Sequence, residues 1–483
     1  MVSINRRQFM AAISATAFTS MGTPAYSAMA NEELRVVVIG LNGIGRTHLE
    51  GFPLIPGVRV VGACDVDSAV LGTRAENFDK KFGYQLKKYD DLRRVYDDPN
   101  VDAVVLAVPN HWHGLGTVWG CQAGKDVYTE KPCSHNIWEA GQMEKAAQKY
   151  ERIVQIGIQR RSFPHLQEFF REIREEGVLG KLKSVKGLYL SRRASIGKPE
   201  VAPKPLPTVN HDLWCGPGST KLERLRYHYD WHWFWDYGNA ELGNNGPHIL
   251  DLCRWVVGAE EFPTSVTSVG GRYAWDDNGQ TPNTHILSYD YATAPITFEI
   301  RDLPTAEGKR DSCKYRGLSY GIVVEGEDAT YLGFDTGKVI DHNGKTIREI
   351  TGDKGPDGGR QLHRENFVKG VRSRKTKDLN CSVRTGHLSS ALCHLGNISH
   401  QLGEPIALSS LPERVQDQPL IAEASERMNE HLAANGVNSQ TASVQLGRTL
   451  EIDPAKEVFP NDDAANQLLR REYRSPFIVP EQV

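Results

Sequence analysis

The sequence predicts an α/β protein with a doubly wound parallel sheet in its first third and a mainly antiparallel sheet in a second domain. Apolar runs alternate with amphipathic stretches between residues 34 and 161, which is typical of parallel strands joined by helices. Short alternating segments separated by Gly and Asp recur between 263 and 350, which indicates antiparallel strands. A chain of 483 residues also exceeds what one hydrophobic core usually organises, so at least two domains are expected.

The first thirty residues differ from the rest of the chain. "NRRQFM" (5–10) carries paired arginines, a weakly apolar run follows, and "AMA" (28–30) is a small-residue cleavage site. This order is typical of a secretory signal, and the paired arginines indicate the twin-arginine export route. We therefore expect residues 1–30 to be a signal peptide and the mature protein to occupy the periplasm or another extracytoplasmic compartment. The alternative is a cytosolic N-terminal arm whose arginines are paired by chance.

Charge and hydropathy argue against two classes of partner. The net charge of −3 gives no general attraction to nucleic acid or to an anionic membrane surface. After the signal, no stretch approaches the roughly 20 apolar residues that span a bilayer. We expect a small-molecule substrate, no nucleic-acid partner and no membrane association after removal of the signal.

A strand, a Gly-rich turn, a helix and a second strand open the first domain, for which we expect residues 31–158. "LRVVVIG" (34–40) reads as a buried strand, and "VRVVGACDVD" (58–67) brings Asp65 twenty residues beyond Gly45. This is the layout of a dinucleotide-binding unit, in which the turn and the helix N-terminus meet the pyrophosphate. The acid accepts hydrogen bonds from the adenosine ribose, which favours NAD over NADP as the cofactor.

The glycine pattern of this turn departs from the usual one. Gly40 and Gly45 hold the first and third positions, but Asn42 holds the second, and Gly43 and Ile44 follow it. Asn tolerates left-handed backbone angles, and Gly43 relieves crowding at the pyrophosphate. We expect all five residues to contact the cofactor.

The alternation continues with strands at 101–109, 125–132 and 152–161 and helices at 113–124 and 136–150. Ligands bind where the carboxyl ends of such strands meet. The residues expected to face that crevice follow three of the strands and are Pro109, Asn110, Glu130, Lys131, Pro132, Gln159 and Arg160. "HWH" (111–113) lacks the acid or cysteine cluster of a metal site, so we expect no metal there and place His113 near the cofactor.

These features together resemble the Gfo/Idh/MocA family of oxidoreductases, which contains glucose–fructose oxidoreductase and inositol dehydrogenase. The resemblance rests on the Gly-rich turn, "CDVD", "PNHWH", "EKP" and "GPHILDLCRW" and covers residues 34–404. It implies a Rossmann domain, then a substrate domain at 159–408 built on a large open sheet, with oxidation of a pyranose or polyol by a nicotinamide cofactor. It also implies that the lysine of Glu-Lys-Pro lies beside the nicotinamide and the reacting hydroxyl. Residues 409–483 are expected to be an extension that packs on this core.

The chemistry of hydride transfer is consistent with that role for Lys131. Charge builds on the alcohol oxygen, and a fixed cation within hydrogen-bond reach stabilises it. Pro132 restricts the backbone of Lys131 and helps to aim its side chain. The alternative is a surface turn held by a salt bridge.

A base is needed to accept the hydroxyl proton, and "ELGNNGPHILDLCRWVVG" (241–258) supplies His248 at the start of a helix. Histidine accepts a proton near neutral pH. The family usually has Asp four residues before this histidine, whereas this chain has Asn244, which cannot relay a proton but can bind a sugar hydroxyl. His248 is therefore expected to be the base and to contact substrate, with a capping or core histidine as the alternative.

The segment "YHYDWHWFWDYGNAE" (227–241) is rich in aromatic side chains. Aromatic faces with interspersed polar groups suit stacking on a pyranose, so Trp235 is expected to bind substrate together with Arg160. Packing between the domains explains the composition equally well.

Three functions remain open from the sequence. The first is NAD-dependent oxidoreduction of a sugar, polyol or glycoside, with a tightly bound cofactor that is carried through export and a homo-oligomer formed through the open sheet. The second is glycoside hydrolysis by transient oxidation and elimination. The third is a non-catalytic sugar-binding protein on a dehydrogenase fold, for which Asn42 and Asn244 are the arguments.

Overall fold

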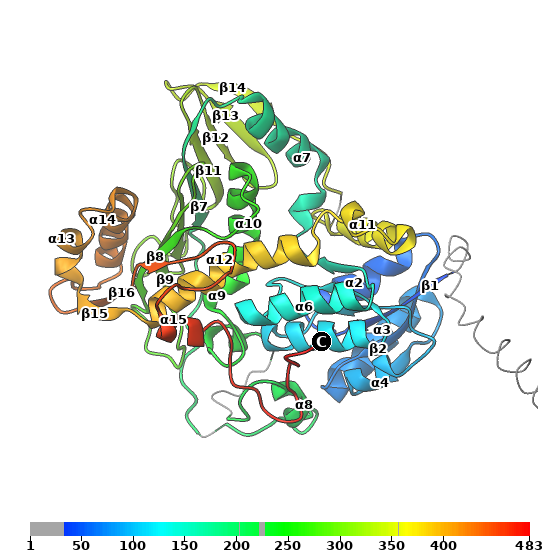
Figure 1. Cartoon of the computed structure of the whole chain (residues 1–483). Coiled ribbons are helices and arrows are strands. Elements are labelled where there is room, and N and C mark those ends of the chain that lie inside the picture. The colour runs from blue at the N-terminus through cyan, green and yellow to red at the C-terminus, as the bar shows by residue number, and fades with distance from the viewer. Residues whose placement is uncertain (1–32, 202, 222–227, 356) are drawn as a thin grey trace, which may run out of the picture.

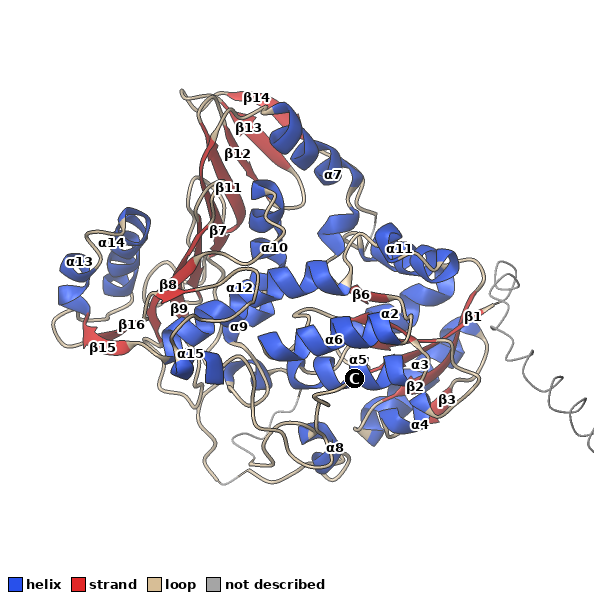
Figure 2. Cartoon of the chain, viewed as in Figure 1, coloured by secondary structure: helices blue, strands red, loops and turns tan. Residues whose placement is uncertain are grey.

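The computed structural model describes residues 33–483 apart from 202, 222–227 and 356, so the expected signal peptide lies outside the described residues. Two domains lie next to each other, one around a six-stranded sheet and one around an eleven-stranded sheet (Figures 1 and 2). Within the described residues, no helix combines the length and the apolar character needed to cross a bilayer.

The first domain is a doubly wound parallel sheet, which confirms the prediction. Its strands lie in the spatial order β3 (Lys87–Tyr89), β2 (Val58–Cys64), β1 (Leu34–Ile39), β4 (Ala103–Leu106), β5 (Asp126–Thr129) and β6 (Val154–Ile156). The helices are α2 (Ile44–Gly51), α3 (Ser68–Phe82), α4 (Leu92–Tyr96), α5 (His113–Gln122) and α6 (Ile137–Lys149). The strand order reverses between β1 and β4, which is where ligands bind in such sheets.

Local sequence explains these elements. Val36, Val37 and Val38 of β1 are fully buried, as a β-branched run in a covered central strand must be. The helix α3 begins at Asp67, whose carboxylate accepts the backbone N–H groups of Ala69 and Val70, a usual N-cap arrangement.

The second sheet is mixed but mostly antiparallel. Its spatial order is β14 (Thr346–Ile350), β13 (Gly337–Ile340), β12 (Thr330–Gly333), β11 (Tyr320–Gly326), β7 (Leu182–Tyr189), β10 (Ile296–Arg301), β9 (Thr284–Asp290), β8 (Ser265–Gly271), β16 (Ser443–Leu446) and β15 (Glu404–Ala407), and β17 (Leu450–Glu451) also pairs with β8. Only β7 and β10 run parallel among the described pairs, because a long crossover separates them in the chain. The sequence patterns did not indicate β13, β15, β16 or β17.

The remaining helices cover this sheet and join it to the first domain. They are α7 (Pro164–Arg171), α8 (His211–Cys215), α9 (Ala240–Asn244), α10 (Gly246–Val257), α11 (Arg360–Ser373), α12 (Val383–Gln401), α13 (Leu411–Arg414), α14 (Pro419–Ala434) and α15 (Asp463–Gln467). The helix α12 contacts both α6 and β8 and so lies between the domains. Although the sequence assigns α11 to the substrate domain, its Phe367 packs with Phe52 and Tyr128 of the Rossmann domain.

The C-terminal residues return to the first domain (Figure 1). After α15 the chain passes α8, and the ring of Phe477 packs against Trp112 with centroids 5.4 Å apart. Gln142 of α6 donates a hydrogen bond to the carbonyl of Pro480 over 2.7 Å. The segment expected as an extension therefore adds strands to the second sheet and then ties both domains together.

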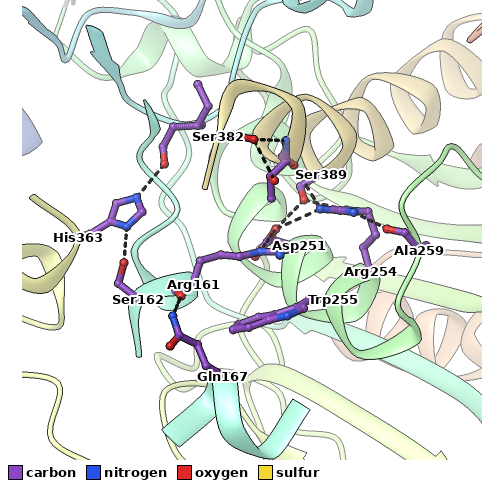
Figure 3. Close-up of polar contacts among 12 residues, drawn as sticks. Arg161, Ser162, Gln167, Asp251, Arg254, Trp255, Ala259, His363, Ser382 and Ser389 are labelled. Atoms are coloured by element: carbon purple, nitrogen blue, oxygen red, sulfur yellow. Dashed lines mark hydrogen bonds and ion pairs between the residues drawn. The ribbon is translucent and has the colours of Figure 1, made fainter. Parts of the chain in front are cut away.

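A buried polar network fixes the joint between the domains (Figure 3). Arg161, which follows β6, donates from Nε to both carboxylate oxygens of Asp251 in α10 over 3.0 Å. Ser389 of α12 donates to the same carboxylate over 2.6 Å and accepts from Arg254 Nε over 3.1 Å. Asp251 is fully buried, and its contacts with Arg161 and Ser389 hold α10 in place.

Candidate active site

A cavity of about 400 Å³ opens at the carboxyl ends of β1, β4 and β5. This volume is within the usual range for small-molecule sites. The Gly-rich turn and Asp65 line one part of it, and Lys131, Asn244 and His248 line another.

The Gly-rich turn is closely packed on one side and open on the other. Gly40 has φ +83°, and a Cβ there would lie 2.4 Å from the carbonyl oxygen of Ala107. A Cβ on Gly45 would lie 1.8 Å from the carbonyl oxygen of Gly40. By contrast, Gly43 has φ +51° with open space beside it. Gly40, Asn42, Gly43 and Ile44 line the cavity, whereas Gly45 does not; its expected contact with cofactor is replaced by a packing role.

The side chain of Asn42 is held away from the centre of the turn. Its Oδ1 accepts a hydrogen bond from Arg74 Nη2 of α3 over 3.2 Å. This contact directs the amide toward α3, so the unusual residue at the second glycine position leaves the turn able to receive a pyrophosphate.

Asp65 lies at the end of β2 and lines the cavity. Its carboxylate accepts backbone N–H groups from Leu41 and Asp67, each over 2.9 Å. Burial raises the pKa of Asp65 above its ordinary value, against these two hydrogen bonds. A carboxylate has about four lone-pair sites, so two remain to accept the hydroxyls of a ribose.

Glu130 and Lys131 follow β5 and point to different partners. His48 Nε2 donates to Glu130 Oε1 over 2.9 Å, and both side chains are buried. Burial opposes ionisation of Glu130, but the hydrogen bond and charge of His48 hold its pKa below the ordinary value. Lys131 Nζ donates to the backbone carbonyl of Asn244 over 2.7 Å and lies 3.4 Å from Asn244 Oδ1. The crevice position expected for "EKP" is therefore occupied, with Glu130 bracing the turn from which Lys131 projects.

His248 lies in the first turn of α10 and lines the same cavity. Its Nδ1 has no hydrogen-bond partner among the described residues. Burial lowers the pKa of His248 well below its ordinary value, and the charges of Arg160 and Lys131 lower it further. The ring is therefore neutral at neutral pH, which is the form that accepts a proton.

A buried carboxylate that the sequence reasoning missed stands behind Asn244. Glu241 is fully buried and forms an ion pair with Arg193, with Nε to Oε2 at 2.9 Å and Nη2 to Oε1 at 3.1 Å. Asn244 Nδ2 donates to Glu241 Oε1 over 3.3 Å. Because the amide nitrogen faces Glu241, the amide oxygen faces Lys131. The acid that the family carries at position 244 thus has a counterpart three residues earlier, a spacing that places both side chains on one helix face.

Three further expected residues differ in their positions relative to the cavity. Pro109 and Asn110 line the cavity, whereas His113 does not. The ring nitrogens of His113 lie 2.6 Å from the carbonyl oxygen of Pro132 and 2.8 Å from that of Val108. His113 begins α5, as expected, and holds together the two loops that follow β4 and β5; its contact with the cofactor stays a prediction.

The two expected substrate contacts outside α9 and α10 also need correction. Gln159 lines the cavity, as expected, whereas its neighbour Arg160 lies 2.7 Å from Asp335 in an ion pair and stacks over Phe334. Trp235 is half-buried outside the lining, because the 3-10 turn Asp230–Trp233 brings Trp231 to the cavity. The aromatic composition indicated the right segment, but only the turn selects the ring.

Comparisons with known proteins agree with this geometry. The family model GFO_IDH_MocA, described as "Oxidoreductase family, NAD-binding Rossmann fold", matches residues 34–158. The model GFO_IDH_MocA_C2, described as "Oxidoreductase family, C-terminal alpha/beta domain", matches residues 179–295 and 416–479.

Among curated relatives, the chain is 24% identical over 247 residues to a levoglucosan dehydrogenase of Pseudarthrobacter phenanthrenivorans, covering 49% of this chain and 54% of the relative. It is 31% identical over 148 residues to a myo-inositol 2-dehydrogenase of Thermotoga maritima, covering 31% of this chain and 42% of the relative. The matched part thus spans about half the length of these relatives.

Two solved structures share the fold. One is a levoglucosan dehydrogenase in complex with NADH and levoglucosan, with a TM-score of 0.57, 17% identity and coverage of 75% of this chain and 96% of that chain. The other is the WlbA dehydrogenase of Bordetella pertussis in complex with NADH and UDP-GlcNAcA, with a TM-score of 0.55, 18% identity and coverage of 76% and 95%.

Proposed function

Because the chain belongs to the Gfo/Idh/MocA family of oxidoreductases, we propose that it transfers a hydride between NAD and a secondary hydroxyl of a sugar, polyol or glycoside. One observation carries the proposal: the Lys131 ammonium and the His248 ring line the same cavity as the Gly-rich turn and Asp65. A cation and a neutral base therefore meet at one end of a site whose other end has the form of a dinucleotide cradle.

The residues of the chain divide the reaction between them. His248 takes the hydroxyl proton of the substrate, and Lys131 donates a hydrogen bond to the oxygen as negative charge builds on it. When bound, NAD supplies the hydride acceptor. Asn244 holds Lys131 through its backbone carbonyl at 2.7 Å, so the ammonium does not reorganise during the reaction.

The cofactor preference follows from the other end of the cavity. Asp65 keeps two lone-pair sites for the ribose hydroxyls, and its negative charge repels a 2′-phosphate. Gly40, Asn42, Gly43 and Ile44 would hold the pyrophosphate, while Pro109, Asn110 and Glu130 would lie nearer the nicotinamide. NAD is therefore preferred over NADP.

Hydrogen bonds fix one part of the cavity lining, which supports a tightly bound cofactor. Trp214 lines the cavity, and the carbonyl of Trp214 accepts hydrogen bonds from His111 Nε2 over 2.9 Å and from Trp112 Nε1 over 3.1 Å. From the C-terminal segment, Arg474 holds the same helix, α8, by donating to the carbonyl of Asp212 over 2.9 Å. These contacts fix Trp214 at the cavity, which supports slow release of a bound cofactor.

Retention of the cofactor matters because we also propose export by the twin-arginine route, based on Arg6 and Arg7. That route carries folded proteins, so NAD bound in the cytoplasm would travel with the chain. Replacing both arginines by lysine should leave the protein in the cytoplasmic fraction of a twin-arginine-competent host. Normal export of this variant would refute the proposed route.

A cofactor that stays bound through each catalytic cycle would also suit a second candidate, glycoside hydrolysis without net redox. Oxidation at a ring carbon acidifies the neighbouring C–H. Loss of that proton expels the aglycone, and water then adds to the resulting double bond. Return of the hydride to the ketone then restores the cofactor. Chromatography of a glycoside panel separates the candidates, because hydrolysis yields free aglycone without accumulated NADH.

The experiment that tests the main proposal uses the mature protein purified from its export compartment. Mass spectrometry of ligands released on denaturation should identify NAD or NADH, and a panel of sugars, polyols and glycosides should change the absorbance of the nicotinamide. Folded protein that neither carries nor binds NAD would refute the proposal. Sugar binding without any exchange of the nicotinamide C4 hydrogen would support the non-catalytic alternative instead.

The proposal includes a homo-oligomer formed through the large sheet. Light scattering on the mature protein at several concentrations tests this part independently, and a monomer at all of them would contradict it.

A further inference from the structure

We propose that the substrate contains a second sugar ring, which stacks on Tyr320, the exposed member of a row of aromatic side chains at the ends of neighbouring strands of the large sheet. The row consists of Tyr189, Tyr320 and Phe334. This inference rests on the proposed function, because it places the reacting ring between Lys131 and His248 and extends the site from there.

The row crosses three neighbouring strands. Tyr189 of β7 and Tyr320 of β11 are direct partners in the ladder, so their side chains lie on the same face of the sheet. Their ring centroids are 5.9 Å apart, and the ring of Phe334, just beyond β12, lies 4.1 Å from Tyr320. Tyr189 and Phe334 are buried, whereas Tyr320 keeps 39% of its surface exposed. The result is a supported platform with one accessible tyrosine.

Both ends of the row lead back to the cavity. At one end, Arg193 lies over the ring of Tyr189 at 5.7 Å and donates to the hydroxyl of Tyr229 over 2.9 Å, and Tyr229 lines the cavity. At the other end, Arg160 lies over Phe334 at 3.4 Å and is preceded by Gln159, which also lines the cavity. None of the three rings lines the cavity itself, but these contacts join the row to Tyr229 and Gln159, which do, so we place the second ring just outside the cavity.

The rim of the platform is polar and charged. Asp335 follows Phe334 and pairs with Lys354 over 3.0 Å, with 25% and 41% of the two side chains exposed. Tyr229 is itself 45% exposed and presents a second aromatic ring on the cavity side. An apolar face bordered by a few donors and acceptors is what a pyranose requires, because its C–H groups meet the ring faces and its hydroxyls meet the rim.

These observations favour a carbohydrate over other occupants. A purely apolar ligand would cover the partly exposed Asp335–Lys354 pair without offering it further hydrogen bonds, which is unfavourable. A small polyol that fills only the space beside Lys131 and His248 would not reach the row. The substrate class is therefore a disaccharide, or an oligosaccharide that ends in the reacting ring.

Calorimetric titration of the NAD-loaded mature protein tests the inference. The probes are cellobiose, maltose and lactose, each compared with glucose and galactose. At least one disaccharide should bind more tightly than its monosaccharides. Tyr320→Ala should weaken binding of that disaccharide by roughly 3- to 10-fold, the scale of one aromatic contact, and should leave monosaccharide binding unchanged. Tyr320→Phe keeps the ring and should bind as the wild type does.

A matched control is available in Tyr84, which lies at the other side of the molecule in the Rossmann domain with Arg59 over its ring at 4.3 Å. Tyr84→Ala should not alter the ratio of disaccharide to monosaccharide affinity. The inference is overturned if no disaccharide binds more tightly than its monosaccharides, or if Tyr320→Ala leaves the ratio unchanged. Because these are binding measurements, a Tyr320-dependent preference without any reduction of NAD would refute the proposed function alone.

Discussion

Replacing Lys131 by methionine separates the proposed chemistry from the structural alternative of a surface turn. Methionine keeps most of the length of the side chain and removes only its charge and its hydrogen-bond donors. The backbone around Glu130 retains the His48 contact at 2.9 Å, and the Gly-rich turn is untouched. We therefore expect the variant to fold and to bind NAD, but to transfer hydride slowly.

The size of the effect follows from the donors of Lys131. An ammonium has three N–H groups. One is engaged by the carbonyl of Asn244 at 2.7 Å, and Asn244 Oδ1 lies at 3.4 Å, so one remains for a substrate oxygen. Loss of one preorganised oxyanion donor costs about 2.7–4 kcal/mol of transition-state stabilisation. This corresponds to a fall in kcat of about 100- to 1,000-fold.

The assay is single-turnover formation of NADH with a substrate found in the sugar panel, together with calorimetric titration of NAD. Lys125→Met is a matched control, because Lys125 is a buried lysine at the opposite end of β5 that donates to the carbonyls of Asp98 and Val101 over 2.8 Å. The control should lower the unfolding temperature and leave kcat unchanged. A folded, NAD-binding Lys131→Met protein with the normal rate would refute the catalytic assignment of Lys131, and "EKP" would then be a structural turn.

Four further outcomes are expected. Asp65→Ala should weaken NAD by roughly 10-fold or more and reduce discrimination against NADP, through loss of a charged hydrogen-bond acceptor; unchanged titrations of both cofactors would contradict this. In the oxidation direction, kcat/KM should stay level as pH falls through the ordinary pKa of histidine and should decline only at lower pH, because burial and nearby cations lower the pKa of His248. His248→Ala should cut kcat roughly 100- to 10,000-fold and abolish this acid-side decline of the pH profile. Loss of the Lys131 proton should make activity decline at high pH. Glu241→Gln should move this decline to lower pH, because Glu241 raises the pKa of Lys131 against its burial, and Glu241→Asp should move it less. An unmoved pH profile would make Glu241 purely structural. Burial raises the pKa of Glu139 from 4.5 to about 7, so the folded state binds its proton more tightly and should lose about 3 kcal/mol of stability as pH rises between these values; urea unfolding should show a smaller loss for Glu139→Gln.

Much of the first domain was determined by local sequence. The buried run at 34–40 has only one stable environment, a strand covered on both faces, and the carboxyl ends of parallel strands must meet at one edge. Asp65, Lys131 and Asn110 were therefore placed at the cavity from their positions after strands alone. His248 was found because it opens an amphipathic helix next to glycine and proline.

The expected residues that do not line the cavity share a physical cause, since their side-chain directions are set in loops and at helix starts. His113 follows β4 as expected, but two carbonyl acceptors, those of Pro132 and Val108, turn its ring away from the cavity. Composition does not distinguish Trp235 from Trp231 as the ring that reaches the cavity, and the 3-10 turn at 230–233 alone decides between them. Arg160 is drawn toward Asp335, a residue 175 positions later in the chain.

The sequence by itself thus determined most of the strands and helices of the first domain, though not β3 or α4, the edge where the sheet opens, and the residue types available there. Periodicity and turn chemistry act over a few residues, and these features depend on nothing more distant. Only the tertiary structure decided that Glu241 pairs with Arg193 and accepts from Asn244, and that Arg474 holds α8 at the cavity. It also decided that Tyr189 and Tyr320 lie next to each other in one sheet. Those contacts join segments far apart in the chain, and they exist because the domains, the long crossover and the C-terminal residues pack on one another.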